Sequence, residues 1–334
     1  MSKIIKQDFN EVINQIRLSK EKAYKQVNTV LIDLYWSIGK YISDKSIKEN
    51  WGKSIVKELA DFIKKEDPTI KGFSDKNLWR MKQFYETYKE NEKLSALLRE
   101  LSWTNNLLIL SSSKTDEERE FYILLSIKEN LSSRELERQI KSSIYERTML
   151  ANKKLSSVVK ELPQDTTNVF KDIYSLEFLG LPSVHSEKKL QQSLVSSLKD
   201  FILELGMGFA FIGEEYRVQV GMEDFYIDLL FFHRHLQCLV AFELKIGKFK
   251  PSDLGQLEFY LEALDRDVKS DTENPSIGVL ICSYKDDEVV KYALSRSLSP
   301  TVIAEYETKL IPKKVLQDKL SELYEQLESD NLDG

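Results

Sequence analysis

Cysteines, histidines and long apolar runs are scarce in this chain of 334 residues, and each shortage excludes a class of protein. Two cysteines, Cys238 and Cys282, and three histidines do not supply a disulfide framework or the grouped ligands of a zinc site. No apolar run approaches the roughly 18 residues needed to cross a membrane. The opening segment MSKIIKQDFNEVINQIRLSK is too charged and too periodic for a signal peptide. We therefore expect a cytoplasmic protein without a membrane partner.

Length and charge distribution predict two domains, because one hydrophobic core rarely serves so long a chain. Residues 1–150 carry 27 Lys and Arg against 23 Asp and Glu, and the remainder carries 21 against 31. A basic first half suits a domain that approaches phosphate, and an acidic second half suits a domain that collects metal, although solvated surface charges give the same totals. We place a linker at 151–170, the second domain at 171–320 and a polar tail at 321–334.

Apolar residues at mixed spacings of three and four predict that residues 1–150 are helical throughout. The expected helices cover residues 8–43, 52–65, 74–88, 115–129 and 132–147. Ser74 is placed to cap the third of these helices, because its hydroxyl can accept a hydrogen bond from the first unpaired backbone amides. The charged helices at 115–129 and 132–147 complete the domain or pair with another subunit, and we expect a homo-oligomer.

Polar side chains follow one side of the helix at 74–88. They are Lys76, Asn77, Arg80 and Gln83, with Lys82 nearby. A short turn followed by a polar helix is the arrangement with which helix-turn-helix proteins read a major groove, so these residues are candidate DNA contacts. The alternative is a polar face that meets only water. We interpret Trp79 and Trp103 as core residues rather than platforms for stacked bases.

The second half predicts an α/β domain with a mixed sheet flanked by helices. A helix at 186–205 precedes strands near 209–220, 224–233 and 236–245, and then come a helix at 252–265, a strand at 276–283, a helix at 286–296 and a strand near 302–306. Sequential hairpins followed by a helical crossover give this kind of sheet.

Three charged residues interrupt strands that otherwise look buried. Asp228 lies within YIDLLFF, and Glu243 and Lys245 end the run LVAFELK. With a tight turn at 234–235, Asp228 would lie opposite Ala241, and Glu243 would be one diagonal step away on the same face. Period-two alternation places Lys245 on that face as well. Buried charges of this kind need partners or a metal ion.

A divalent cation accounts for this grouping best. Two neighbouring carboxylates repel each other in a poorly solvated site, and Mg²⁺ with oxygen ligands removes the repulsion. The ion could lower the pKa of a bound water while Lys245 steadies the attacking hydroxide or the phosphate, which is the chemistry of phosphodiester hydrolysis. A buried ion pair between Asp228 and Lys245 is the alternative interpretation.

The helix after Lys245 adds further candidates. Gln256 and Tyr260 lie one turn apart and face the same side, so they could orient a metal-bound water or a phosphate, or could simply pack against the sheet. Lys248 and Lys250 are candidate phosphate contacts. His233 and His235 flank the expected turn, where we expect them to face solvent.

Residues 208–264 resemble the nuclease domain of the YhcG-type PDDEXK family, within the PD-(D/E)xK nuclease superfamily. Asp228 falls on the first metal-binding acid of that superfamily, Glu243 on the second and Lys245 on its lysine, and Gln256 and Tyr260 match a Gln-x-x-x-Tyr motif of the RecB-like branch. YWSIGK, WGKSIV, GFSDKNLWRMKQFYETY and RELERQI resemble the family's N-terminal domain. The resemblance implies a magnesium or manganese cofactor and hydrolysis of nucleic acid.

One position departs from the family pattern. An acid is expected after Leu190, but the chain has Gln191 there, which is a weaker metal ligand. Glu187 and Glu204 are the candidates to replace it.

We therefore expect an endo- or exonuclease that acts on DNA, with RNA not excluded, in restriction, defence or repair. The alternative is a catalytically inactive DNA-binding protein or an interaction subunit of a restriction or defence assembly.

Overall fold

The computed structural model describes residues 3–182, 184–295 and 297–332, and it divides into two compact units on either side of the bond between Glu137 and Arg138. Within the described residues, no helix is both long enough and apolar enough to span a bilayer.

The first unit is helical, as the sequence predicts. Its elements are α1 (Lys3–Lys48), α2 (Lys53–Glu66), α3 (Asp75–Tyr88), α4 (Glu92–Leu97), η1 (Leu98–Glu100), α5 (Trp103–Ser112) and α6 (Asp116–Lys128), with α7 (Ser133–Lys141) across the boundary. The Ser74 hydroxyl accepts a hydrogen bond from the Asn77 amide at 3.3 Å, so the predicted N-cap of α3 is confirmed.

Helices α1 and α3 pack unusually closely. A Cβ atom at Gly39 of α1 would lie 2.1 Å from the Met81 carbonyl oxygen of α3, so only glycine permits this approach. Phe84 of α3 contacts Trp103 edge to face, with ring centroids 5.2 Å apart, and Trp103 also donates from Nε1 to Asn77 at 3.0 Å. Trp103 is therefore a half-buried packing residue of the unit, as expected, rather than a platform for bases.

The second unit is built on a mixed sheet, which confirms the predicted α/β class. The strands are β1 (Ile173–Ser175), β2 (Phe209–Val220), β3 (Glu223–His233), β4 (Cys238–Lys248), β5 (Ile277–Tyr284) and β6 (Thr301–Glu307). They lie in the order β1-β6-β5-β4-β3-β2. β1, β6, β5 and β4 run parallel, and β4, β3 and β2 pair antiparallel.

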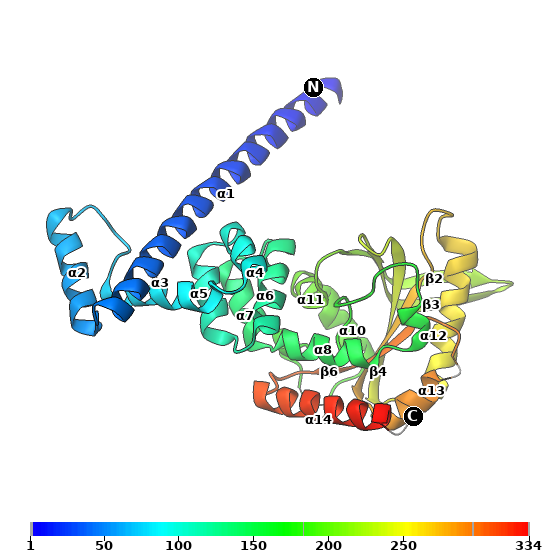
Figure 1. The fold of residues 1–334 in the computed structure, drawn as a ribbon. Coiled ribbons are helices and arrows are strands. Elements are labelled where there is room, and N and C mark those ends of the chain that lie inside the picture. Colours follow the sequence, from blue (N-terminus) through cyan, green and yellow to red (C-terminus); the bar gives the residue numbers. More distant parts are fainter. Residues whose placement is uncertain (1–2, 183, 296, 333–334) are drawn as a thin grey trace. The chain divides into compact units, whose positions relative to one another are not determined.

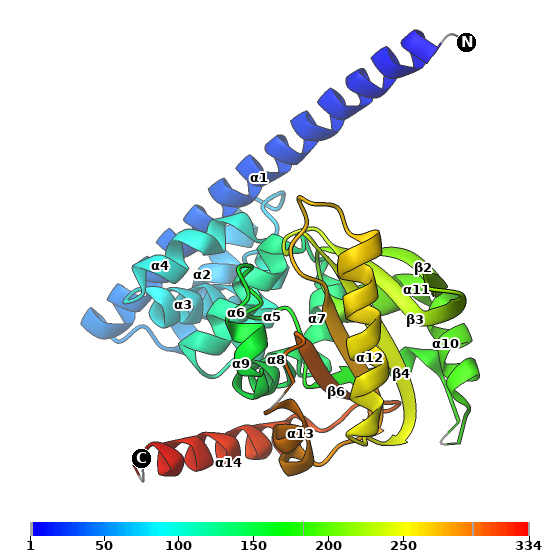
Figure 2. The ribbon, with the colours of Figure 1, turned by 90° about the vertical axis from the view of Figure 1, so that its right-hand side faces the viewer.

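Helices cover both faces of this sheet. They are α8 (Ile144–Lys154), α9 (Ser157–Lys160), η2 (Glu177–Leu179), α10 (Glu187–Ser196), α11 (Leu198–Leu205), α12 (Ser252–Ala263), the π-helical turn η3 (Leu264–Val268), α13 (Asp287–Leu294) and α14 (Lys313–Leu332). Leu190, Leu194 and Phe201 of α10 and α11 enter the core on one face. Leu257 and Leu261 of α12 enter the core on the other, and α12 crosses the sheet in Figure 2.

Three segments differ from their predicted form. The helix expected at 186–205 breaks at Ser197 into α10 and α11. Residues 151–170, expected as a linker, pack into the second unit, with Val159 and Phe170 in its core. Residues 321–332, expected as a polar tail, continue helix α14, whose Leu316 is buried beside α8 (Figure 1).

Candidate active site and nucleic-acid surface

The hairpin of β3 and β4 brings Asp228 beside Glu243. The strands pair through Leu229 with Phe242 and His233 with Cys238, and continuing this register sets Asp228 opposite Glu243. The predicted partner Ala241 is wrong, because the connection has four residues rather than two. A shift of two residues leaves every side chain on its expected face of the sheet. Asp228 and Glu243 therefore still lie on the same face, although the predicted register is wrong.

The longer turn has a packing cause. Leu236 folds into the core with an exposed fraction of 2%, and its amide donates to Nδ1 of His233 at 3.1 Å. His233 is itself 1% exposed, and its Nε2 lies 3.1 Å from the Met207 carbonyl oxygen. The expectation that His233 faces solvent is therefore wrong, while His235 is exposed as predicted. His233 stabilises the turn at the end of the hairpin opposite to Asp228.

The electrostatics of the two acids favour a bound cation. Burial, followed by repulsion from Asp228, raises the pKa of Glu243 to about 7. Burial also raises the pKa of Asp228, although its Oδ2 accepts a hydrogen bond from the Leu244 amide at 2.8 Å. Both shifts are the response of carboxylates that lack a compensating positive charge. A divalent ion would supply that charge.

Lys245 compensates the negative charge of the two acids only in part. Its Nζ donates to Oε1 of Glu243 at 2.8 Å. Burial disfavours its charge, but the hydrogen bond and attraction to Glu243 outweigh burial and raise the pKa of Lys245. The ion pair joins Lys245 to Glu243 rather than to Asp228, so the predicted alternative of an Asp228–Lys245 pair is not what the described side chains form.

The donor set fits a hydrated magnesium ion. Oε2 of Glu243 is buried and has no hydrogen-bond partner among the described residues, so one lone-pair-bearing atom is left for a ligand. No three Asp, Glu, His or Cys side chains within the described ranges are gathered into a metal-binding group. Magnesium keeps several of its waters and commonly takes one or two protein carboxylates together with substrate phosphate. Asp228 and Glu243 match that requirement.

Glu187 supplies a further acid at this site. Its Oε1 accepts from the Ile246 amide at 3.2 Å, directly after Lys245 on β4. Its charge contributes to the raised pKa of Asp228, Glu243 and Lys245. Of the two acids considered as replacements for the missing family acid, Glu187 is therefore the one beside the site.

Glu204 belongs to a different part of the fold. It is fully buried on α11, where it pairs with Arg147 and accepts from the Ser175 amide at 2.9 Å. Gln191 also takes a structural position, because its Nε2 donates to the backbone carbonyl of Asp228 at 3.0 Å. The neutral amide thus holds the strand that carries the first acid.

Gln256 and Tyr260 form one hydrogen-bonded pair on α12. Nε2 of Gln256 donates to the Tyr260 hydroxyl at 2.7 Å. Burial raises the pKa of Tyr260, and the charges of Glu243 and Asp228 add to the shift. The structure thus brings this pair within electrostatic range of both acids.

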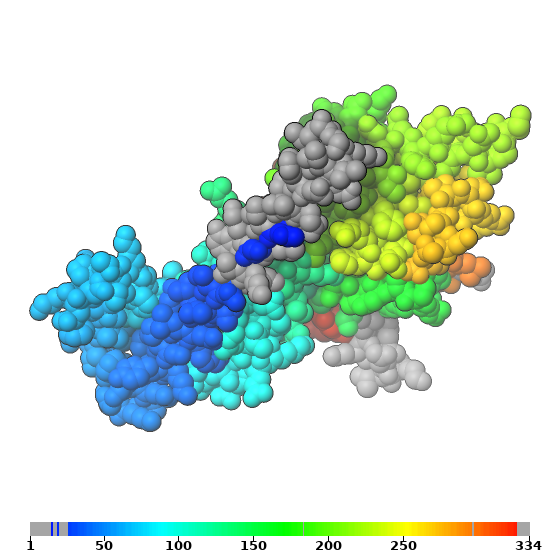
Figure 3. Space-filling model, turned by 90° about the horizontal axis from the view of Figure 1, so that it is seen from above, coloured from blue at the N-terminus to red at the C-terminus, as the bar shows by residue number. Residues whose placement is uncertain are grey.

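Two lysines extend the site along the chain. Lys248 lies at the exposed end of β4, over the ring of Tyr284 with 5.5 Å to its centroid and 3.8 Å from Asp286. Lys250 is exposed just before α12. The hairpin of β2 and β3 lies beside α12, as the yellow-green and yellow atoms show in Figure 3. Phe225 of β3 contacts Phe259 of α12 with ring centroids 4.6 Å apart.

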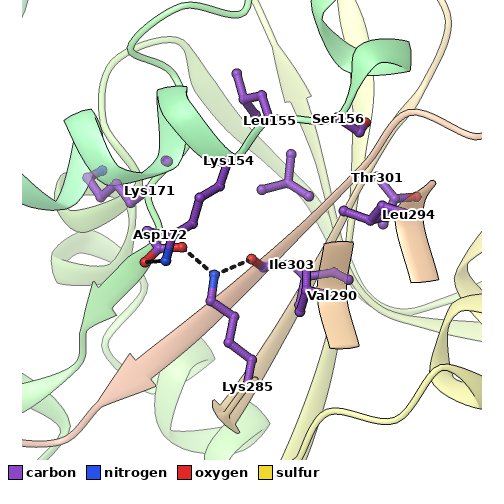
Figure 4. A pocket seen from close by; sticks show the side chains of 12 residues that line it. Lys154, Leu155, Ser156, Lys171, Asp172, Lys285, Val290, Leu294, Thr301 and Ile303 are labelled. Atoms are coloured by element: carbon purple, nitrogen blue, oxygen red, sulfur yellow. Dashed lines mark hydrogen bonds and ion pairs between the residues drawn. The ribbon is translucent and has the colours of Figure 1, made fainter. Parts of the chain in front are cut away.

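A second charged cluster in the same unit is structural. Asp172 accepts from Lys285 and from Lys154, and Lys285 also donates to the Ile303 carbonyl at 2.9 Å (Figure 4). The cavity there measures about 20 Å³, which is room for about one water molecule. The ion pairs of Asp172 with Lys154 and Lys285 anchor α8 to the sheet. The cavity beside them is too small for a substrate.

A basic groove lies between α2 and α3 of the first unit. Its volume is about 590 Å³, and its lining includes Lys53 and Lys57 of α2, Lys76 and Arg80 of α3, and Trp79. Sequence reasoning selected only the residues on α3. Trp79 is half-buried and its ring is in contact with Lys82 of its own helix, so the positive side chains around it suit a phosphate backbone rather than a stacked base.

Of the remaining predicted DNA contacts, Gln83 lies on the surface of α3, whereas Lys82 and Asn77 make contacts within the unit. Gln83 is exposed on the same side of α3 as Lys76 and Arg80. Lys82 is held over the Trp79 ring at 4.9 Å and lies 3.4 Å from Glu86. Asn77 donates to the Gly72 carbonyl and accepts from Trp103, so its amide is already used within the unit.

Comparisons with known proteins match both units. Residues 167–321 match a family model described as "YhcG PDDEXK nuclease domain", and residues 11–147 match one described as "DUF1016 N-terminal domain". The chain is 31% identical over 346 aligned positions to "Putative nuclease YhcG" of Escherichia coli (strain K12), with 92% of each chain covered. A repair endonuclease from Pyrococcus abyssi matches 40% of this chain and 50% of its own, at 16% identity and a TM-score of 0.26. So low a score carries no argument.

Proposed function

The chain belongs to the YhcG PDDEXK nuclease family, and on that premise we propose that it hydrolyses DNA phosphodiester bonds with a divalent ion, Mg²⁺ or Mn²⁺, held by Asp228 and Glu243. The observation that carries the proposal is the pairing of half-buried Asp228 with buried Glu243, whose pKa values are both raised and of which Oε2 of Glu243 has no hydrogen-bond partner among the described residues. Such a pair is costly unless a cation joins it.

In this mechanism the cation supplies Lewis-acid chemistry, which acidifies a bound water and offsets charge on the phosphate. The chain's own residues orient the reactants. The Leu244 amide fixes one oxygen of Asp228, and Gln191 fixes its backbone. Lys245, once drawn from Glu243 toward substrate, offers its ammonium to the attacking oxygen or to a phosphate oxygen. No covalent intermediate is needed, because water can attack in line.

Gln256 and Tyr260 are proposed to align the phosphate under attack. They already share a hydrogen bond, so the phenol is held in one orientation beside the acids. A positioned hydroxyl and amide lower the cost of ordering the substrate in the transition state. Glu187, beside Lys245, is the proposed third acid for a second ion or a water.

Substrate binding is proposed to use the basic groove of the first unit together with Lys248 and Lys250 of the second. Lys76, Arg80 and Gln83 would contact the duplex from α3. Contacts of this kind to phosphate add affinity without sequence preference and weaken with salt. A role in restriction, defence or repair, with partners from such a system, is a further proposal that rests on the family resemblance alone.

Glu187 argues against the alternative of an inactive DNA-binding protein. Gln191 alone would remove an acid from the family pattern, but Glu187 brings a carboxylate to the same side chains. The charge of Glu187 adds to the repulsion that raises the pKa of Asp228 and Glu243, which favours a site that holds a cation over one kept only as scaffold.

Cleavage of defined DNA tests this proposal. Linear, circular and single-stranded DNA, and RNA of the same sequence, would be incubated with the full chain in Mg²⁺, Mn²⁺ or EDTA. We expect metal-dependent cleavage of DNA that is lost in Lys245→Ala and kept in the control Lys199→Ala, which changes an exposed lysine of α11. The proposal would be contradicted if Lys245→Ala cut DNA as fast as Lys199→Ala, if DNA were cut in EDTA, or if RNA alone were cut.

A further inference from the structure

One face of helix α1 packs within the first unit. Ile32, Tyr35 and Ile42 are buried there, with exposed fractions of 2%, 9% and 0%. The main packing partners of α1 are α3, η1 and α5. This face accounts for the role of α1 in its own unit. On the other side of the helix, Tyr41 is the only described residue with a ring contact within the unit, with Trp51 at 5.9 Å between centroids.

The opposite face of α1 is exposed and apolar. Val27, Val30, Leu34 and Tyr41 are 56%, 68%, 43% and 54% exposed. Leu31 lies on the same side at 37%. We call Val27, Val30, Leu34 and Tyr41 the α1 seam. Single exposed apolar residues are ordinary, but a row of them along one helix marks an interaction surface.

The spacing of the seam is that of a coiled coil. Its four residues fall on the first and fourth positions of successive seven-residue repeats, with Ser37 as the one polar member of the row. In the sequence, Ile13, Ile16 and Ala23 continue the same repeat toward the N-terminus, interrupted by Lys20. A seven-residue repeat keeps one stripe of a helix facing a single neighbouring helix.

We propose that the α1 seam pairs with the α1 seam of a second copy of this chain, so that the protein is a dimer. Val27, Val30 and Leu34 carry no charge. Among the described side chains, the one cation over a seam residue is Lys45 at the Tyr41 ring, 5.7 Å from its centroid, so the seam favours an apolar partner over nucleic acid. Heptad positions fit the holes of another heptad stripe, and the same helix in a second molecule always provides one. Closed two-fold pairs are also the commonest assembly of soluble proteins.

The length of α1 suits this role. The helix spans 46 residues. At 1.5 Å per residue it is about 69 Å long. In both ribbon views its N-terminal half runs past the other helices of its unit (Figures 1 and 2). Helices that extend beyond their own core need packing from elsewhere, because isolated helices in water are marginal. The proposal does not depend on hydrolysis and stands or fails separately from the proposed function.

Sedimentation of the full chain tests the proposal. The wild type is expected to sediment at twice the mass of one chain, and the double variant Val30→Glu with Leu34→Glu at the mass of one. The dimer dissociation constant of the variant should rise at least tenfold, since each copy places two carboxylates in the seam. The matched control Leu298→Glu changes a leucine that is 90% exposed outside the seam, and it should remain dimeric.

Cross-linking keeps the test independent of how well the double variant folds. Cys238 and Cys282 are buried, so a cysteine introduced at Val27, Leu34 or Tyr41 would be the accessible thiol. A bifunctional maleimide should join two copies through at least one seam position and not through Leu298→Cys. A monomeric wild type, a double variant that dimerises as tightly as the wild type, or seam thiols that cross-link no better than Leu298→Cys would overturn the proposal.

Discussion

Replacing Glu243 by glutamine is expected to stabilise the metal-free protein at high pH while it abolishes cleavage. Burial and repulsion from Asp228 raise the pKa of Glu243 from 4.5 to about 7. Because the folded-state pKa lies above the unfolded one, this group stabilises the fold only when protonated. The free energy of unfolding falls as the pH rises from about 4.5 to 7. In that range the unfolded chain has released the Glu243 proton while the folded chain still holds it.

The size of the effect follows from the shift. Moving a pKa from 4.5 to about 7 corresponds to about 3 kcal/mol at pH 8, at roughly 1.4 kcal/mol per unit. A glutamine at this position pays no such cost and can still accept the hydrogen bond from Lys245. We therefore expect Glu243→Gln to raise the free energy of unfolding by about 1–3 kcal/mol at pH 8 in EDTA, and by less than about 0.5 kcal/mol at pH 4.5.

The assay must report on the second unit. All four tryptophans lie between Trp36 and Trp103, so their fluorescence follows only the first unit. Hydrogen exchange of peptides from 223–248, in urea at both pH values, measures the strands that carry the acids. Magnesium should stabilise the wild type and close the gap at pH 8, because an ion that binds only the folded state adds to its stability.

Two results would refute this reasoning. One is a Glu243→Gln variant that is no more stable than the wild type at pH 8. The other is a stability difference that does not change between pH 4.5 and pH 8. The control Glu288→Gln alters an exposed acid at the start of α13 and should show no pH-dependent difference.

Further predictions concern the charged side chains. Lys245→Ala should lower the cleavage rate at least about 100-fold with DNA affinity retained, measured by single-turnover cleavage and by anisotropy. Glu187→Gln should weaken magnesium binding in calorimetry, and the fold should persist because glutamine can still accept the hydrogen bond from the Ile246 amide. Glu204→Gln should instead cost about 3–5 kcal/mol of stability and leave magnesium affinity unchanged, since it breaks a buried ion pair. Lys57→Ala and Arg80→Ala should each reduce the slope of log affinity against log salt by about 1, and unchanged slopes would remove the groove from the DNA surface.

The fold class and the grouping of the acids could be predicted because each depends on a strong local pattern. Spacings of three and four residues predict the helices of the first unit, and period-two alternation decides which strand residues share a face. The sheet face of Asp228 and Glu243 is unchanged by a register error of two residues, so their meeting does not require the turn to be known.

What could not be predicted depends on contacts between distant segments. The four-residue turn exists because Leu236 finds a place in the core, which no local pattern reports. The three residues of β1 are too few for a periodic signal, and they pair with β6, far along the chain. Glu187 and Glu204 look alike in the sequence, but one faces Lys245 and the other faces Arg147. The contribution of Lys57 to the groove likewise requires the packing of α2 on α3.

The position of a manganese ion in a crystal of the full chain would show directly whether Asp228 and Glu243 hold a metal. An anomalous difference map collected above the manganese edge locates the ion without reference to activity. We expect a peak within coordination distance of carboxylate oxygens from both Asp228 and Glu243, and no such peak in Asp228→Asn. A fully loaded crystal with manganese elsewhere and none between these two side chains would contradict this expectation.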